Sequence, residues 1–188
     1  MKLNDLKKEL KEMGREELCE IITDLFKSNK SVKDFLSYHL RQSDEKLMEN
    51  YKSEIKKAIN PEKGQKIKLA KARKILSDFR KIGGKPEEQV KLMFFYIEQG
   101  LIFSKKLKYT ADSFMSSLFS VYQSALKLIK SEYLPEDFIV IAGNITADVY
   151  GTSSYWGNCF QEQFNNAFPE IQSSAEIISK TDTSSIEI

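Results

Sequence analysis

The chain contains very few of the residues that catalysis and metal binding usually require. Its 188 residues include one histidine, His39, and two cysteines, Cys19 and Cys159. Two cysteines so far apart provide neither a disulfide framework nor the ligand spacing of a zinc site. A lone histidine cannot supply the paired Glu-x-x-His motifs of two-metal helical bundles. Because the sequence also lacks a glycine-rich phosphate loop and a nucleophile triad, we predict no catalytic residue, no metal and no cofactor.

Long apolar runs are also absent. Residues 138–142 form one of the longest, and it is far shorter than the roughly 20 apolar residues that cross a bilayer. Residues 1–5 lack the apolar region of a signal peptide. We therefore expect a cytoplasmic protein without a membrane partner, in which His39 packs at the edge of the core and both cysteines are buried, inert thiols.

Apolar residues at helical spacing are abundant. From Leu3 to Phe168 they recur at intervals of three and four residues, which is the period of amphipathic helices. This pattern predicts an all-α protein of eight or nine amphipathic helices in antiparallel hairpins, forming one compact or short stacked-helix domain over residues 3–168. Residues 173–188 are rich in serine and threonine, and we predict that they form a loosely ordered C-terminal tail.

Particular residues predict where the helices begin and end. We expect Ser31 to cap the third helix, and Gly83-Gly84 to give the fifth a left-handed exit. Pro86 suits the first position of the sixth helix. The β-branched run at residues 138–141 is the one serious strand candidate, but the Pro-Glu-Asp before it favours a helix. The inward faces predicted for the second and third helices comprise Leu18, Ile21, Ile22, Leu25, Phe26, Val32, Phe35, Leu36, His39 and Leu40.

Charge is distributed unevenly along the chain. Residues 52–85 hold 12 Lys/Arg against 3 Asp/Glu, whereas residues 86–188 hold 7 against 13. If residues 65–82 form one helix, basic side chains seven positions apart lie on one line and face away from Leu76. Such a face can neutralise phosphates, although a solvated face or a contact with the acidic C-terminal half of the chain is the commoner explanation. The candidate anion- or partner-binding residues are Lys66, Arg73, Lys74, Arg80 and Lys81.

A second candidate lies where the apolar pattern is interrupted after Val149. Loops between rigid elements often contact ligands, whereas glycines at such a break also suit a hinge. The candidate ligand-binding or hinge loop consists of Tyr150, Gly151, Trp156 and Gly157. The aromatic residues that follow at four-residue spacing, Phe160, Phe164 and Phe168, are predicted to pack in the core.

Four stretches of the chain resemble an uncharacterised family of small bacterial helical proteins, grouped as a domain of unknown function. These stretches are Lys71–Phe79, Met93–Gly100, Ser124–Lys130 and Gly151–Gly157. The resemblance covers most of residues 5–165. It implies a helical fold and a bacterial origin, and it brings no activity, cofactor or catalytic residue with it.

These observations predict a non-catalytic cytoplasmic interaction protein, with an adaptor or regulatory role and another macromolecule, first of all a protein, as its partner. One alternative is binding of nucleic acid or another polyanion through a basic helix at residues 65–82. A second alternative is an enzyme with a polar pocket, which a deep pocket lined by several acids with shifted pKa values would favour. The sequence does not specify an oligomeric state.

Overall fold

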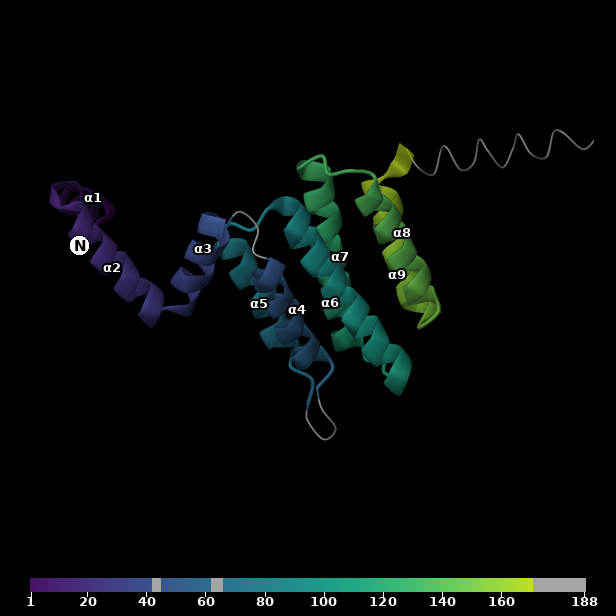
Figure 1. Ribbon diagram of the computed structural model, residues 1–188. Coiled ribbons are helices and arrows are strands. Elements are labelled where there is room, and N and C mark those ends of the chain that lie inside the picture. The colour runs from purple at the N-terminus through teal and green to yellow at the C-terminus, as the bar shows by residue number, and fades with distance from the viewer. Residues whose placement is uncertain (42–44, 62–65, 171–188) are drawn as a thin grey trace, which may run out of the picture.

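The computed structural model describes residues 1–41, 45–61 and 66–170, and over these ranges the chain forms nine α-helices and no strand (Figure 1). This confirms the predicted all-α class, and residues 138–141 are helical. The predicted tail at residues 173–188 lies outside the described ranges. The helices are α1 (Leu3–Glu12), α2 (Arg15–Ser28), α3 (Lys30–Arg41), α4 (Glu45–Ile59), α5 (Leu69–Lys81), α6 (Pro86–Leu107), α7 (Asp112–Ser131), α8 (Asp137–Tyr150) and α9 (Ser154–Ala167).

Most of the residues predicted to mark the beginning or end of a helix do so, and one does not. Gly83 has a φ of 80° directly after α5, and Pro86 is the first residue of α6. The prediction that Ser31 caps α3 is wrong. The side chain of Asn29 does this instead, because its Oδ1 accepts from the backbone N–H of Ser31 at 2.9 Å and of Val32 at 3.3 Å. The cap therefore lies two residues earlier than expected.

The two long helices α6 and α7 lie at the centre of the main body, with α4 and α5 on one side and α8 and α9 on the other (Figure 1). Large side chains such as Phe79, Tyr96 and Leu118 are fully buried there. The hydroxyl of Tyr96 lies 2.8 Å from Ser117 Oγ, so this buried polar group keeps a hydrogen bond. Apolar burial and satisfied polar groups together define one core across α4 to α9.

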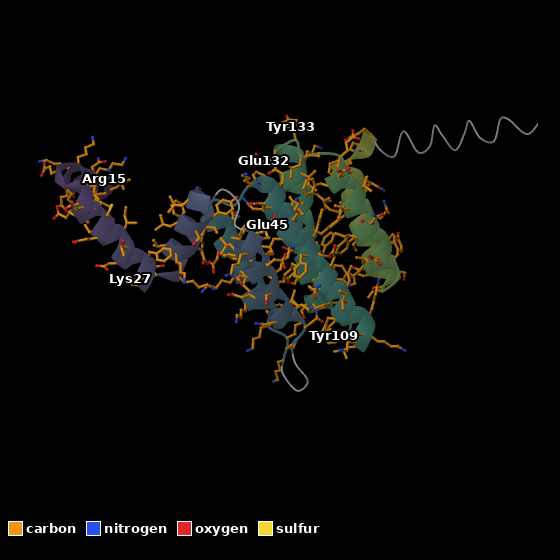
Figure 2. The ribbon with its side chains drawn as sticks, in the orientation of Figure 1. Arg15, Lys27, Glu45, Tyr109, Glu132 and Tyr133 are labelled. Carbon is orange, nitrogen blue, oxygen red and sulfur yellow. The ribbon has the colours of Figure 1, made fainter. Side chains whose placement is uncertain are left out.

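The helices α1 and α2 project from this body as an N-terminal arm (Figures 1 and 2). Neither helix contains a buried residue, and the principal helix contact of α2 is with α3. The predicted inward faces of α2 and α3 are therefore largely wrong. Leu18, Val32 and Leu36 are half-buried and His39 is exposed, while the remaining six are 37–78% exposed: Ile21, Ile22, Leu25, Phe26, Phe35 and Leu40.

The helix α3 connects the arm to the body, and its C-terminal end is anchored there. Tyr38 is buried there, where its hydroxyl donates to Glu88 Oε2 at 2.5 Å and accepts from the backbone N–H of Lys85 at 2.8 Å. His39 Nε2 lies 3.0 Å from the carbonyl oxygen of Ile82. These bonds tie the C-terminal end of α3 to the turn between α5 and α6, whereas the arm precedes the N-terminal end of α3.

Candidate functional site

The basic residues predicted to share one line are separated in the structure. Lys66 is exposed and precedes α5, which begins only at Leu69, so the proposed helix over residues 65–82 is too long. Lys74 is exposed on α5, and Lys81 lies 3.4 Å from Asp78. Only the two arginines of the predicted set line a common groove.

This arginine groove runs along α5, α6 and α7 and has a volume of about 170 Å³. Arg73 and Arg80 rim it, and Arg73 Nη2 donates to Ser120 Oγ at 3.2 Å. Leu76, Met93 and Val121 line it from three different helices. The prediction that the arginines face away from Leu76 is therefore wrong, since all three residues line the same groove. The groove combines positive charge with an apolar floor of Leu76, Met93 and Val121. Ser77 and Ser124 also line it.

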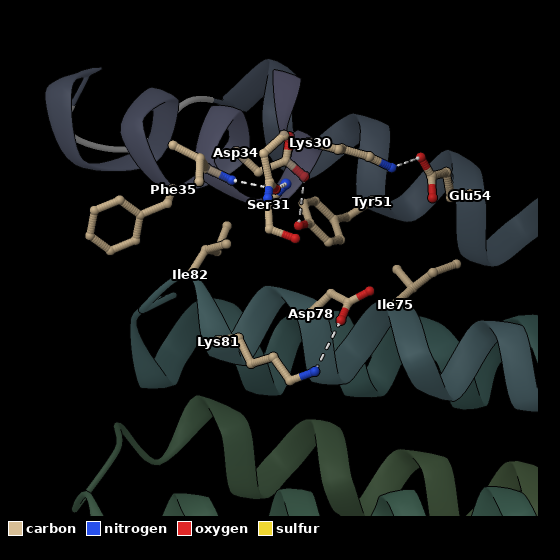
Figure 3. A pocket seen from close by; sticks show the side chains of 12 residues that line it. Lys30, Ser31, Asp34, Phe35, Tyr51, Glu54, Ile75, Asp78, Lys81 and Ile82 are labelled. Carbon is tan, nitrogen blue, oxygen red and sulfur yellow. Dashed lines mark hydrogen bonds and ion pairs between the residues drawn. The ribbon is translucent and has the colours of Figure 1, made fainter. Parts of the chain in front are cut away.

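A larger pocket of about 320 Å³ lies between α3, α4 and α5 (Figure 3). Apolar side chains, including Phe35 and Ile75, form part of its wall. Three carboxylates, those of Asp34, Glu54 and Asp78, also line it. The enzyme alternative requires an acid-lined pocket of this kind. Whether these carboxylates are available for catalysis depends on the groups that they already contact.

Each of the three carboxylates already has a donor (Figure 3). Tyr51 donates to Asp34 Oδ2 at 3.0 Å, Lys30 Nζ lies 2.8 Å from Glu54 Oε1, and Lys81 Nζ lies 3.4 Å from Asp78 Oδ1. Two of these pairs link one helix to another, α3 to α4 in both cases.

The pKa values of the donors show the effect of these pairs. Burial, reinforced by the charges of nearby carboxylates, raises the pKa of Tyr51 far above its ordinary value. The hydrogen bond to Glu54 raises the pKa of Lys30. Both donors therefore keep their protons near neutral pH, and neither can act as a general base there. The arrangement ties helices together. Within the described ranges, no group of three or more His, Cys, Asp or Glu side chains could hold a metal ion.

The predicted ligand-binding or hinge loop is a tight corner between two helices. Tyr150 ends α8, and Trp156 and Gly157 lie in the first turn of α9, so only residues 151–153 connect the helices. A Cβ on Gly157 would lie 2.5 Å from the ring of Tyr150. The structure thus brings Tyr150 and Gly157 into direct contact, while Trp156 is half-buried near Phe119. A ligand at this corner remains a prediction.

The prediction for the remaining aromatic residues is confirmed, whereas the prediction for the two cysteines is wrong. Phe160, Phe164 and Phe168 are buried, which confirms that they belong to the core. Cys19 is exposed on α2 and Cys159 is half-buried, so the prediction of two buried thiols is wrong.

The site that sequence reasoning missed is the exposed apolar face of α2, here called the arm face and formed by Ile21, Ile22, Leu25 and Phe26. Its four members follow helical spacing, so the sequence identified them as apolar and assigned them to the core. Their spacing is the same as that of a core helix, and only the position of the arm shows that the body does not cover them. Four exposed apolar side chains on one side of a helix make the arm face a candidate interaction surface.

In the part of the chain that the structure describes, no helix has the length and apolar character needed to cross a membrane.

Comparison with other proteins places the chain in a family. Neither the curated proteins nor the solved structures include a match to this sequence. A model of a family of unknown function, DUF6155, matches residues 1–168, and the chain therefore belongs to that family.

Proposed function

We propose that this protein is a non-catalytic adaptor or regulatory protein of the bacterial cytoplasm that binds another protein through the arm face. The observation that carries the proposal is the exposure of Ile21, Ile22, Leu25 and Phe26 on a helix without a buried residue. An amphipathic helix that presents its apolar side to solvent is suited to lie in an apolar groove of a partner. Two free cysteines, one of them exposed, fit a reducing compartment.

The acid-lined pocket gives less support to an enzyme. Its carboxylates are held by Tyr51, Lys30 and Lys81, and these pairs account for its polar groups without a substrate. By contrast, the four side chains of the arm face are 37–47% exposed, with Lys33 of α3 over the ring of Phe26. Full burial of an apolar side chain of this size contributes roughly 1.5–3 kcal/mol. Because these side chains are 37–47% exposed, each would contribute only a fraction of that to a complex.

Affinity purification from the native cell, followed by mass spectrometry, tests the proposal with two matched variants. Ile21→Lys/Leu25→Lys places two charges on the arm face, and we expect it to lose the partners that the unchanged protein retains. Cys19→Lys/Thr23→Lys places the same charges at the same spacing elsewhere on exposed α2, and we expect it to retain them. Because all four positions are solvent-exposed, both variants should keep the fold, as circular dichroism would show. Equal partner sets for both variants would exclude the arm face as the binding surface.

A further inference from the structure

We propose that the occupant of the arginine groove is α2 of a second copy of this chain, and that two copies exchange their arms. This inference rests on the proposed function, because Ile21 belongs both to the arm face and to the side of α2 that would enter the groove. Both complementary surfaces are present on the same molecule: an exposed apolar helix, and a groove with an apolar floor.

The charges of the two surfaces are opposite. The helix α2 carries four acidic residues against Arg15 and Lys27, whereas α5 carries five basic residues against Asp78 alone. Opposite potentials across an interface orient the partners and exclude other registers. The acidic α2 of one copy therefore suits the basic α5 of another.

The spacing of the acidic residues on α2 also matches the spacing of the arginines on α5. Glu17 and Asp24 are seven residues apart on α2, and Arg73 and Arg80 are seven apart on α5. Each pair spans two helical turns, about 10.5 Å, and so lies on one side of its helix. A helix laid along the groove can therefore bring both acids to both arginines at once.

The apolar residues that lie between these charged residues also match on the two helices. Ile21 lies between Glu17 and Asp24 on the same side of α2, and it is exposed. Leu76 occupies the corresponding place between the two arginines, where it lines the groove with Met93 and Val121. Contact between Ile21 and this floor would bury apolar surface from both copies, which a nucleic-acid phosphate cannot do.

The position of the arm favours a second molecule over its own groove. Tyr38 fixes the C-terminal end of α3 to the turn between α5 and α6, and α2, which precedes the other end of α3, extends away from α6 and α7 (Figure 1). Reciprocal exchange of arms places one α2 in each groove and closes the assembly as a dimer.

Sedimentation velocity of the full chain across micromolar concentrations tests the exchange. We expect the unchanged protein to be dimeric. Arg73→Glu/Arg80→Glu should weaken the dimer roughly a hundredfold, since like charges across an interface cost several kcal/mol. Lys71→Glu/Lys74→Glu makes the same change in charge on α5 outside the groove, and it should leave the dimer intact.

A charge exchange separates specific pairing from loss of folding. Glu17→Arg/Asp24→Arg should also give a monomer. An equimolar mixture of this variant with Arg73→Glu/Arg80→Glu should form a heterodimer, because each arm then meets a groove of opposite charge. A wild-type monomer, or a mixture that stays monomeric, would overturn the exchange. The exchange would also be overturned if Arg73→Glu/Arg80→Glu and its control, Lys71→Glu/Lys74→Glu, weakened the dimer equally.

The outcomes also separate this inference from the proposed function. If the wild-type protein is monomeric but Ile21→Lys/Leu25→Lys loses a cellular partner, the arm face binds a different protein and only the exchange is wrong. If the protein neither self-associates nor loses a partner on this change, both proposals are wrong. Salt-sensitive binding of single-stranded DNA by a monomer, lost in Arg73→Glu/Arg80→Glu, would assign the groove to a polyanion instead.

Discussion

Gly100 on α6 lies so close to Leu118 on α7 that a Cβ at position 100 would be 2.5 Å from Leu118 Cδ2. Both residues are buried where the two long central helices meet. Absence of a side chain at position 100 is therefore what allows this close approach. Alanine normally favours a helix over glycine by about 1 kcal/mol, whereas overpacking in a core costs about 1–3 kcal/mol.

We expect Gly100→Ala to lower the free energy of unfolding by up to about 2 kcal/mol in urea denaturation, because the packing cost exceeds the gain in helix propensity. Gly143→Ala in α8 is the matched control. A Cβ there would meet Phe164 at 3.7 Å, an ordinary contact, so this change should raise the free energy of unfolding by about 0.5–1 kcal/mol. Stabilisation by both substitutions would show that α6 and α7 do not pack as described.

Deletion of residues 1–28 tests how far the cooperative domain extends. Because neither α1 nor α2 contains a buried residue, we expect the free energy of unfolding to change by less than about 1 kcal/mol. The measurement belongs in the Arg73→Glu/Arg80→Glu background, so that self-association does not contribute. Phe79→Ala, at a residue only 1% exposed, should cost about 3–5 kcal/mol and serves as the comparison. A loss of several kcal/mol on deletion would instead support one domain over residues 3–168.

Stability should fall steeply at alkaline pH, partly through Tyr38. Burial, together with the hydrogen bond to Glu88, raises the pKa of Tyr38 to about 12, against an ordinary value of about 10. Between these values the unfolded chain has lost this proton while the folded chain keeps it, so the free energy of unfolding decreases as pH rises. The contribution of Tyr38 is complete below about pH 10 and is lost as pH rises towards 12.

We therefore expect Tyr38→Phe to be less stable than the unchanged protein at pH 8, by about 1–2 kcal/mol for the lost hydrogen bonds, but to lose less stability from pH 10 to pH 12. Tyr133, which is 92% exposed, provides the control: Tyr133→Phe should leave both the stability and its pH dependence unchanged. Urea denaturation at several pH values measures both quantities. Parallel pH profiles of stability for the unchanged protein and Tyr38→Phe would contradict the raised pKa of Tyr38 as a cause of the alkaline loss of stability.

The fold class followed from the sequence because helical spacing is a local property. The left-handed Gly83 and the start of α6 at Pro86 were predictable for the same reason, since each depends on a conformational preference of one residue. Ser31 was misassigned because Asn29, two residues earlier, is an equally good cap and the sequence alone does not choose between them.

The candidate sites were less predictable because they depend on which helices pack together. Spacing showed that Ile21 and Leu25 share an apolar face, but it could not show that no helix of the body covers this face. Arg73 and Arg80 were placed on a solvated face because the groove beside them is completed by Met93 of α6 and Val121 of α7. Neither residue is near them in sequence.

The separation of the basic residues leads to a last prediction, on polyanion binding. Lys66 precedes α5, and Lys74 and Lys81 do not line the arginine groove, so a polyanion there would meet only Arg73 and Arg80. Two phosphate contacts give a slope of log affinity against log salt of roughly −1.8 on duplex DNA and −1.4 on single strands. The attraction from so few contacts is weak.

We expect fluorescence anisotropy to detect no binding of mixed-sequence DNA or RNA at micromolar protein and about 0.15 M salt, where screening is strong. The same titration at low salt should show at most weak binding. Arg73→Glu/Arg80→Glu and Lys71→Glu/Lys74→Glu should reduce this residual binding equally, because a non-specific attraction depends on net charge and not on the groove. Binding at 0.15 M salt that has the slope of two or more phosphates, and that only the groove variant loses, would show that the groove binds phosphates and that the arm competes with a polyanion for it.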